Sequence, residues 1–267
     1  ALQPVFVLDT DILSRFTNPK DRRLSFIAAA LCQIHTELKK RGGGLLVLHG
    51  SAGELIPKLY TALNVSRIFA NEDYEPSARV RDEHVAKHAK LKLFKDHVIF
   101  APSEIMKDDS SAYKVFTPYS KAWLSKLTPL SYEPCDLKDK GRYADFAQTK
   151  KVAVDAGLTL VDVDDEATML AQIGYEYVKD ALWTVDDAAK RLKQFATQKI
   201  KAYATARDMV AEEGTSQLSP YLRFGLISVR ECMREAVAAG GGAGASTWIK
   251  ELIWREFYAM ILYHYPD

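Results

Sequence analysis

A chain of 267 residues is long enough for one large domain or two of ordinary size. With 48% hydrophobic and 27% charged residues, its composition is that of a soluble globular protein. The formal net charge is only +1, so the overall charge gives no reason to expect a nucleic-acid partner. A local basic patch could still exist, because net charge does not show how the charges are distributed.

The cysteines and the apolar runs bear on the compartment. Cys32, Cys135 and Cys232 are odd in number and widely spaced, which argues against a disulfide framework and suits a reducing cytosol. No apolar run approaches the length needed to cross a bilayer. The apolar residues Val5 to Leu8 are followed at once by Asp9, unlike a signal peptide. We expect a soluble cytoplasmic protein with no membrane partner.

Short β-rich runs alternate with helical patterns in the first third of the chain. The expected order is strand 5–8, helix 24–38, strand 45–48, helix 55–63, strand 67–70 and a polar helix 76–91, then an apolar segment around 97–100. Such alternation with short connections predicts right-handed crossovers and a parallel, Rossmann-like sheet. The fold class expected for this part is therefore α/β.

The rest of the chain has a different pattern. From about Thr128 to Asp165 it is charged and aperiodic, as in an interdomain connector. After about Gly174 it is helical without strands, with one long helix that ends near Met209 and a last helix over 247–263. The glycine-rich stretch 240–244 lacks the Lys-Ser/Thr pair of a phosphate loop, and we interpret it as a flexible connection.

The stretch 214–222 has features of an anion site. Ser219 followed by Pro220 predicts a helix start, with a hydroxyl cap and then proline in the first turn. Thr215 and Ser216 place hydroxyl donors beside exposed amides at this positive helix end, which suits a phosphate or pyrophosphate. An ordinary capped loop is the alternative.

The last helix has two unlike faces. At 100° per residue, Glu251, Trp254, Arg255 and Tyr258 fall within roughly one 100° arc. The opposite side is apolar and consists of Ile249, Leu252, Ile253, Phe257 and Met260. A surface salt bridge between Glu251 and Arg255 is the simple interpretation. It leaves Trp254 exposed, which indicates a stacking platform for a base.

Two further pairs are spaced one helical turn apart. Tyr203 and Arg207 could address the same ligand region, or be a core tyrosine beside a solvated arginine. His84 and His88 have metal-ligand spacing, but without a fitted third ligand we interpret them as a solvated helix face and expect no metal site.

Several motifs carry a family resemblance. They are residues 71–76 (NEDYEP), 94–97 (FKDH), 116–119 (FTPY), Arg207-Asp208, 213–225 (EGTSQLSPYLRFG) and 248–258 (WIKELIWREFY). In this order they resemble the photolyase/cryptochrome family, nearest to class I cyclobutane pyrimidine dimer photolyases, along essentially the whole chain. The resemblance implies an α/β antenna-type domain at 1–127, an interdomain connector at 128–173 and part of an all-helical FAD-binding domain at 174–267.

The resemblance also implies an activity and a set of site residues. The activity is light-dependent repair of UV-damaged DNA, in which reduced FAD passes an electron to a flipped-out pyrimidine dimer and the cyclobutane ring splits. The implied FAD-binding residues are Tyr203, Thr215, Ser216, Gln217, Leu218, Ser219 and Trp248. The implied DNA-binding residues are Arg207, Glu251, Trp254, Arg255 and Tyr258, with Glu251 and Trp254 in the catalytic role.

Other features separate the subfamilies. Glu251 favours dimer repair, because (6-4) photolyases and animal cryptochromes usually carry Gln there. Where folate-type enzymes hold the pterin with an Asn-Glu pair, this chain has Ser77 and Ala78. That disfavours a folate antenna and leaves a deazaflavin, a flavin or no antenna open. A cryptochrome-type blue-light sensor that binds FAD without repair is the alternative function.

The extent of the chain differs from the family pattern. Family members begin with an additional strand and continue beyond Asp267, through further helices of the FAD domain. We therefore expect a partial chain or a truncated relative, and a monomer. An inactive fragment, or a nucleotide-binding module with a remnant of helices, remains an alternative.

Overall fold

The computed structural model describes residues 1–135, 141–179 and 183–266. It divides into two compact units, each made of separate stretches of the chain. Unit 1 comprises Ala1–Phe69, Val80–Lys92 and Leu137–Val185, and unit 2 comprises Ala70–Arg79, Leu93–Asp136 and Asp186–Asp267. These units differ from the predicted contiguous boundaries at 127 and 173.

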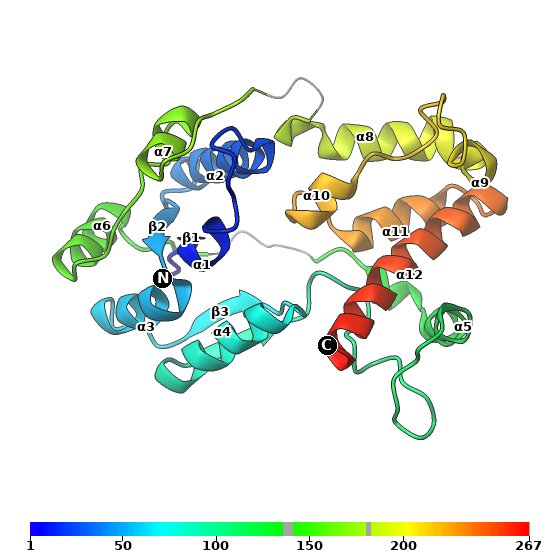
Figure 1. Ribbon diagram of the computed structural model, residues 1–267, viewed down its shortest axis with the longest axis horizontal. Coiled ribbons are helices and arrows are strands. Elements are labelled where there is room, and N and C mark those ends of the chain that lie inside the picture. The colour runs from blue at the N-terminus through cyan, green and yellow to red at the C-terminus, as the bar shows by residue number, and fades with distance from the viewer. Residues whose placement is uncertain (136–140, 180–182, 267) are drawn as a thin grey trace. The chain divides into compact units, whose positions relative to one another are not determined.

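Unit 1 is the α/β part of the chain (Figure 1). Its elements are β1 (Val5–Asp9), α1 (Thr10–Leu13), α2 (Arg22–Lys40), β2 (Leu46–Gly50), α3 (Ala52–Ala62), most of α4 (Pro76–His88), α6 (Phe146–Asp155) and α7 (Glu166–Gln172). Strands β1 and β2 pair in parallel, with Val5 opposite Leu46 and Asp9 opposite Gly50. The predicted α/β class and the parallel pairing are confirmed.

Strand β2 is buried on both faces, because apolar layers cover each side of it. Leu46 and Leu48 pack in one cluster with Leu59 of α3 and Ala153 of α6. The intervening Val47 belongs to a second cluster, with residues from α2 and α7. A strand covered on both faces needs a continuous apolar run, which is the pattern that this sequence shows.

Much of the predicted connector belongs to unit 1. Leu158 packs against the β2 cluster, Leu160 forms an antiparallel bridge to Leu48, and Val161 and Met169 lie in the core. The helices in this stretch, α6 and α7, are short and present few apolar side chains to the core. Periodicity therefore carries little signal there.

A second strand pair was only half predicted. β3 (Ile68–Asn71) pairs with β4 (Leu91–Phe94). The sequence predicted the first of these strands at 67–70 but not β4, because it extended the preceding helix to Leu91. Ile68 N–H donates to Lys90 O and Glu72 N–H to Phe94 O, each at 2.9 Å, so the two strands run in parallel. The division between the units falls inside both strands.

Unit 2 is helical from residue 186 onward (Figure 1). It contains α5 (Phe116–Lys126), the short helix η1 (Pro129–Tyr132), and, after η2 (Val185–Asp187), a helical run of α8 (Ala188–Gln194), η3 (Phe195–Lys199), η4 (Ile200–Ala202) and α9 (Tyr203–Ala206). It ends with α10 (Ser219–Arg223), α11 (Val229–Ala238) and α12 (Ala243–His264). The predicted long helix thus includes a π-helical segment, η3, and stops three residues before Met209.

Candidate functional site

The last helix, α12, carries most of the side chains that the sequence singled out. It begins directly after Gly240–Gly242, all at positive φ. A Cβ atom on Gly244, in its first turn, would lie 1.9 Å from the Ile200 carbonyl oxygen, so only glycine permits this close approach. The predicted core face is confirmed for Leu252, Ile253, Phe257 and Met260, which are buried, whereas Ile249 is only half-buried.

The outward side of α12 holds an ion pair. Arg207 Nη1 donates to Glu251 Oε1, and both side chains are about one-third exposed (30% and 32%). This hydrogen bond raises the pKa of Arg207. The Arg207 guanidinium carbon also lies 5.6 Å from the ring centroid of Tyr203, which is buried. Glu251 therefore pairs with Arg207, and the simple interpretation of a Glu251–Arg255 bridge is wrong.

An aromatic stack adjoins the ion pair. The rings of Trp254 and Phe116 are nearly parallel, with centroids 3.7 Å apart and an interplanar angle of 4°. Tyr258 follows at 5.4 Å and 25°, and 63% of it is exposed. Trp254 is half-buried rather than exposed as expected, because Phe116 of α5 packs against its ring.

Arg255 points away from this stack, although the helical wheel placed it in the same arc. Its Nη1 donates to the carbonyl oxygen of His97. Burial lowers the pKa of Arg255 and also that of His97. The long arginine side chain thus reaches an internal acceptor, which a wheel projection of Cα positions does not reveal.

The predicted phosphate-binding loop lines a small pocket. Thr215, Ser216 and Gln217 share its wall with Phe195 of η3, and the other lining residues are Arg191, Gln194, Lys199 and Glu213. Its volume is about 70 Å³. Ligand pockets that enclose a whole small molecule are usually about 300–1,000 Å³. A pocket of this volume could hold only part of a dinucleotide.

Polar contacts shape this pocket. Arg191 Nη1 donates to Gln217 Oε1 at 2.8 Å, and Gln217 has a positive φ of 52°. Lys199 Nζ lies 3.5 Å from Glu213. A Cβ atom on Gly214 would lie 2.2 Å from the Ala206 carbonyl oxygen, so the loop passes close to the end of α9. The pocket lining thus combines two cations, Arg191 and Lys199, with one carboxylate, Glu213, and two hydroxyl side chains.

The other predicted FAD residues lie at different depths. Leu218 is buried at 1% exposure, and Ser219 is the first residue of α10 with no side-chain cap hydrogen bond, so the expected serine cap is wrong. Tyr203 and Trp248 are both buried and pack against Phe195, with ring centroids 5.4 Å and 4.8 Å from it. Both contact Phe195, which lines the pocket wall.

Sequence reasoning missed several contributors to the site. Arg191 and Lys199 line the pocket, and the only available signal was their position on the helix that carries Tyr203. Phe116 and Glu256 both lie in motifs that carry the family resemblance, but the motifs alone assign them no partner. Their roles depend on contacts between segments far apart in sequence.

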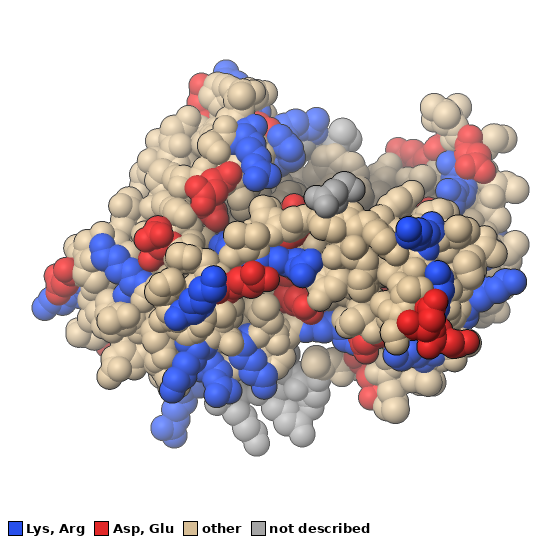
Figure 2. Space-filling view, turned by 60° about the horizontal axis from the view of Figure 1, so that its bottom comes forward, with Lys and Arg blue, Asp and Glu red and all other residues tan. Residues whose placement is uncertain are grey.

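The charges on the surface form no broad single-sign field on the face that Figure 2 shows, where basic and acidic side chains are interspersed. In the described residues, no three metal-ligating side chains converge. Among these same residues, no helix combines the length and apolar character required to cross a membrane. The candidate site is therefore defined by the local ion pair and the pocket.

Comparisons with known proteins agree with this architecture. The DNA photolyase family model matches residues 1–137. The deoxyribodipyrimidine photo-lyase of Synechococcus sp. is 31% identical over 98% of this chain and 55% of its own length. That of Salmonella typhimurium is 33% identical over 92% of this chain and 51% of its own length. The chain thus spans about half the length of these relatives.

Solved structures share the fold. A Synechocystis cryptochrome aligns with a TM-score of 0.77 and 18% identity, covering 99% of this chain and 56% of that protein. A class III photolyase from Agrobacterium tumefaciens aligns with a TM-score of 0.73 and 20% identity, covering 99% and 54%. Because the family model matches half of the sequence and the fold agrees over nearly all of it, the chain belongs to the DNA photolyase family.

Proposed function

We propose that this chain supplies the lesion-binding face and part of the FAD site of a light-dependent deoxyribodipyrimidine photolyase. The observation that carries the proposal is the Glu251–Arg207 pair beside the Trp254–Phe116 stack on one side of α12. Relatives at 31–33% identity are named deoxyribodipyrimidine photo-lyase, which supports the same activity. The substrate would be a cyclobutane pyrimidine dimer in UV-damaged DNA.

The site has the chemistry needed to recognise an extruded pyrimidine. A dimer must leave the base stack to reach a buried cofactor, and its weakened pairing lowers that cost. The Glu251 carboxylate would accept a hydrogen bond from a pyrimidine imino group, and Arg207 would donate to a carbonyl or phosphate oxygen. Trp254 and the exposed Tyr258 supply ring surface, and stacking contributes roughly 1–3 kcal/mol per base. We assign no lesion contact to Arg255 in this proposal, because its Nη1 donates to the His97 carbonyl oxygen.

The pocket at 215–217 fits the diphosphate of FAD. Arg191 and Lys199 would balance its charge, while Thr215 and Ser216 would donate hydroxyl hydrogen bonds. Tyr203 and Trp248 would support the wall through Phe195. Bound in its reduced form, FAD would supply on illumination the electron that splits the cyclobutane ring.

Three finer expectations belong to the same proposal. Ser77 is exposed and Ala78 is buried at 7%, so neither reproduces an Asn-Glu grip on a pterin. A deazaflavin or flavin antenna, if there is one, is therefore favoured over a folate. We also expect a cytoplasmic monomer.

The test uses an oligonucleotide with one thymine dimer and its undamaged twin. We expect the chain to bind the dimer strand more tightly, and, with reduced FAD, to remove the dimer in light but not in darkness. Replacing Glu251 with Ala should lower the preference for damage about tenfold. The exposed Glu212, changed to Gln, is the matched control and should leave the preference unchanged.

Each outcome decides between functions. Flavin binding without any preference for the dimer would favour the cryptochrome-type sensor over the photolyase. Equal binding of both strands together with no flavin uptake would refute both parts of the proposal for this chain.

A further inference from the structure

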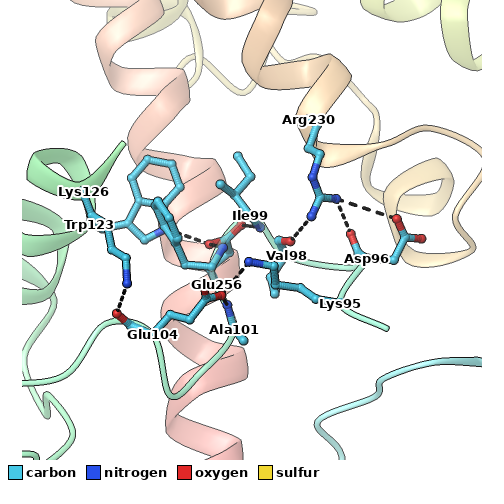
Figure 3. A network of polar contacts seen from close by, with 11 residues as sticks. Lys95, Asp96, Val98, Ile99, Ala101, Glu104, Trp123, Lys126, Arg230 and Glu256 are labelled. Carbon is cyan, nitrogen blue, oxygen red and sulfur yellow. Dashed lines mark hydrogen bonds and ion pairs between the residues drawn. The ribbon is translucent and has the colours of Figure 1, made fainter. Parts of the chain in front are cut away.

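The segment after β4 is held by charged side chains rather than by a sheet (Figure 3). Arg230 of α11 donates to the carbonyl oxygens of Asp96 and Val98, each at 3.0 Å. Arg255 of α12 donates to the carbonyl between them, that of His97. This clamp, formed by Arg230 and Arg255, gives a hydrogen-bond partner to the carbonyl of Val98, which is only 1% exposed and would otherwise be buried without one.

Glu256 of α12 holds the next two residues of the same segment, as a hydrogen-bond acceptor. Its carboxylate accepts from the backbone N–H groups of Ile99 and Phe100, the latter at 3.2 Å. It also accepts from Trp123 Nε1 at 2.7 Å, and the residue is 2% exposed. Burying a carboxyl group is costly unless its oxygens are hydrogen-bonded, and these three donors offset part of that cost. A single side chain therefore joins α12, the 99–100 backbone and α5.

The same helix α5 also carries the ring that stacks on Trp254. Phe116, Tyr119 and Trp123 are spaced i, i+3 and i+7, so they share one face of α5. Along that face Phe116 stacks on Trp254 and Tyr119 contacts Phe257, with centroids 5.2 Å apart. At its far end Trp123 bonds Glu256. A sliding or rotation of α5 against α12 would therefore change the Phe116–Trp254 stack.

We propose that Glu256 is a positioning residue for the lesion-binding face: by joining Trp123 and the Ile99–Phe100 backbone to α12, it sets the register in which Phe116 holds the Trp254 indole. The relevance to DNA rests on the proposed function, whereas the register itself is a property of this chain. Glu256 has no exposed surface from which to contact DNA, so it would act through Trp254 alone.

The first experiment tests, without DNA, whether Glu256 sets the position of α5 against α12. In the full chain, indole N–H resonances of Trp123, Trp254 and Trp183 would be assigned by NMR, with Trp183 as the reference in unit 1. The Glu256→Gln variant keeps the side-chain shape but turns an NH₂ group toward N–H donors. We expect both the Trp123 and Trp254 resonances to shift while that of Trp183 stays. Glu104→Gln, a half-exposed carboxylate elsewhere in Figure 3, is the control and should leave Trp254 unchanged.

A DNA readout then separates the two proposals. If the wild-type chain prefers the dimer strand, Glu256→Gln should reduce that preference on the order of tenfold, with little change in binding to undamaged DNA. If the wild-type chain shows no preference, the proposed function fails and the resonances alone decide the register. An unmoved Trp254 resonance in folded Glu256→Gln would overturn the inference.

A second variant covers the case in which Glu256→Gln does not fold. Trp123→Phe keeps a ring in the core and leaves the carboxylate with its backbone donors. We expect the Trp254 resonance to shift in this variant too, because α5 loses its bond to α12. If Trp254 stayed fixed, α5 would be positioned by packing alone and the assignment to Glu256 would be wrong.

Discussion

Raising the pH from about 5 to about 8 should reduce the stability of this chain through Glu256, and Glu256→Gln should abolish that part of the pH dependence. Burial raises the pKa of this carboxyl from 4.5 to about 7, against the opposing effect of its three N–H donors. The folded chain therefore keeps the proton up to about pH 7, while the unfolded chain releases it near 4.5. Between these values the folded state binds more protons, so the free energy of unfolding falls as the pH rises.

The magnitude follows from the displacement of the pKa. A change from 4.5 to about 7 corresponds in full to about 3.5 kcal/mol, at about 1.4 kcal/mol for each pH unit. The nearby Arg255 lowers the pKa of Glu256. The neighbouring Tyr74 and Tyr119 do not titrate in this range, because burial raises the pKa of each phenol. His97, whose pKa is lowered by burial, is present in both proteins and cancels in their difference.

The assay is urea denaturation of wild type and Glu256→Gln across this pH range, followed by circular dichroism and indole fluorescence. The difference between the two free energies of unfolding should change by about 2.5 kcal/mol between pH 5 and pH 8, because part of the full effect falls below pH 5. Glu104→Gln is the control and should show almost no change over this range. Hydrogen bonds from Lys95 and Ala101 outweigh burial and lower the pKa of Glu104 below 4.5, so its contribution is lost only on acidification below this range. A wild-type minus Glu256→Gln difference that stays constant with pH would refute the reasoning.

Three further predictions concern the helix packing, the ion pair and the pocket. Gly244→Ala should destabilise the chain by about 1–3 kcal/mol in thermal or urea unfolding, because a methyl group would meet the Ile200 carbonyl at 1.9 Å. Arg207→Gln should weaken binding of the dimer oligonucleotide about tenfold, measured by fluorescence anisotropy, since it removes the cation that pairs with Glu251. Lys199→Ala should raise the Kd for FAD about tenfold in a flavin-fluorescence titration.

Controls for these variants come from the same elements. Ser246→Ala on the exposed side of the same turn of α12 should change stability by less than about 0.5 kcal/mol. The exposed Lys193 on α8, changed to Ala, should leave the FAD Kd unchanged. A tolerated Gly244→Ala, or equal effects of Lys199→Ala and Lys193→Ala, would contradict the packing and the pocket respectively.

The sequence predicted the parts of the fold that depend on local patterns. Short apolar runs separated by helical patterns located β1, β2 and the helices between them. Helical spacing identified the core face of α12 with Leu252, Ile253 and Met260. The motifs indicated the family, which the match over residues 1–137 confirms. Boundaries were less certain, since α4 ends at His88 and leaves room for the unpredicted β4.

For the candidate site, too, local patterns identified some of the residues, but not their partners. Helical spacing alone picked out Glu251 and Trp254 on a face that core packing does not explain, and the family resemblance added Arg207. The sequence also determined the helical character of the chain after Gly174, because periodicity and capping act over a few residues. Only the tertiary structure decided that Glu251 pairs with Arg207, and that Trp254 stacks on Phe116. These partners are separated by 44 and 138 positions, and contacts at such separations depend on how whole helices pack, which no local pattern encodes.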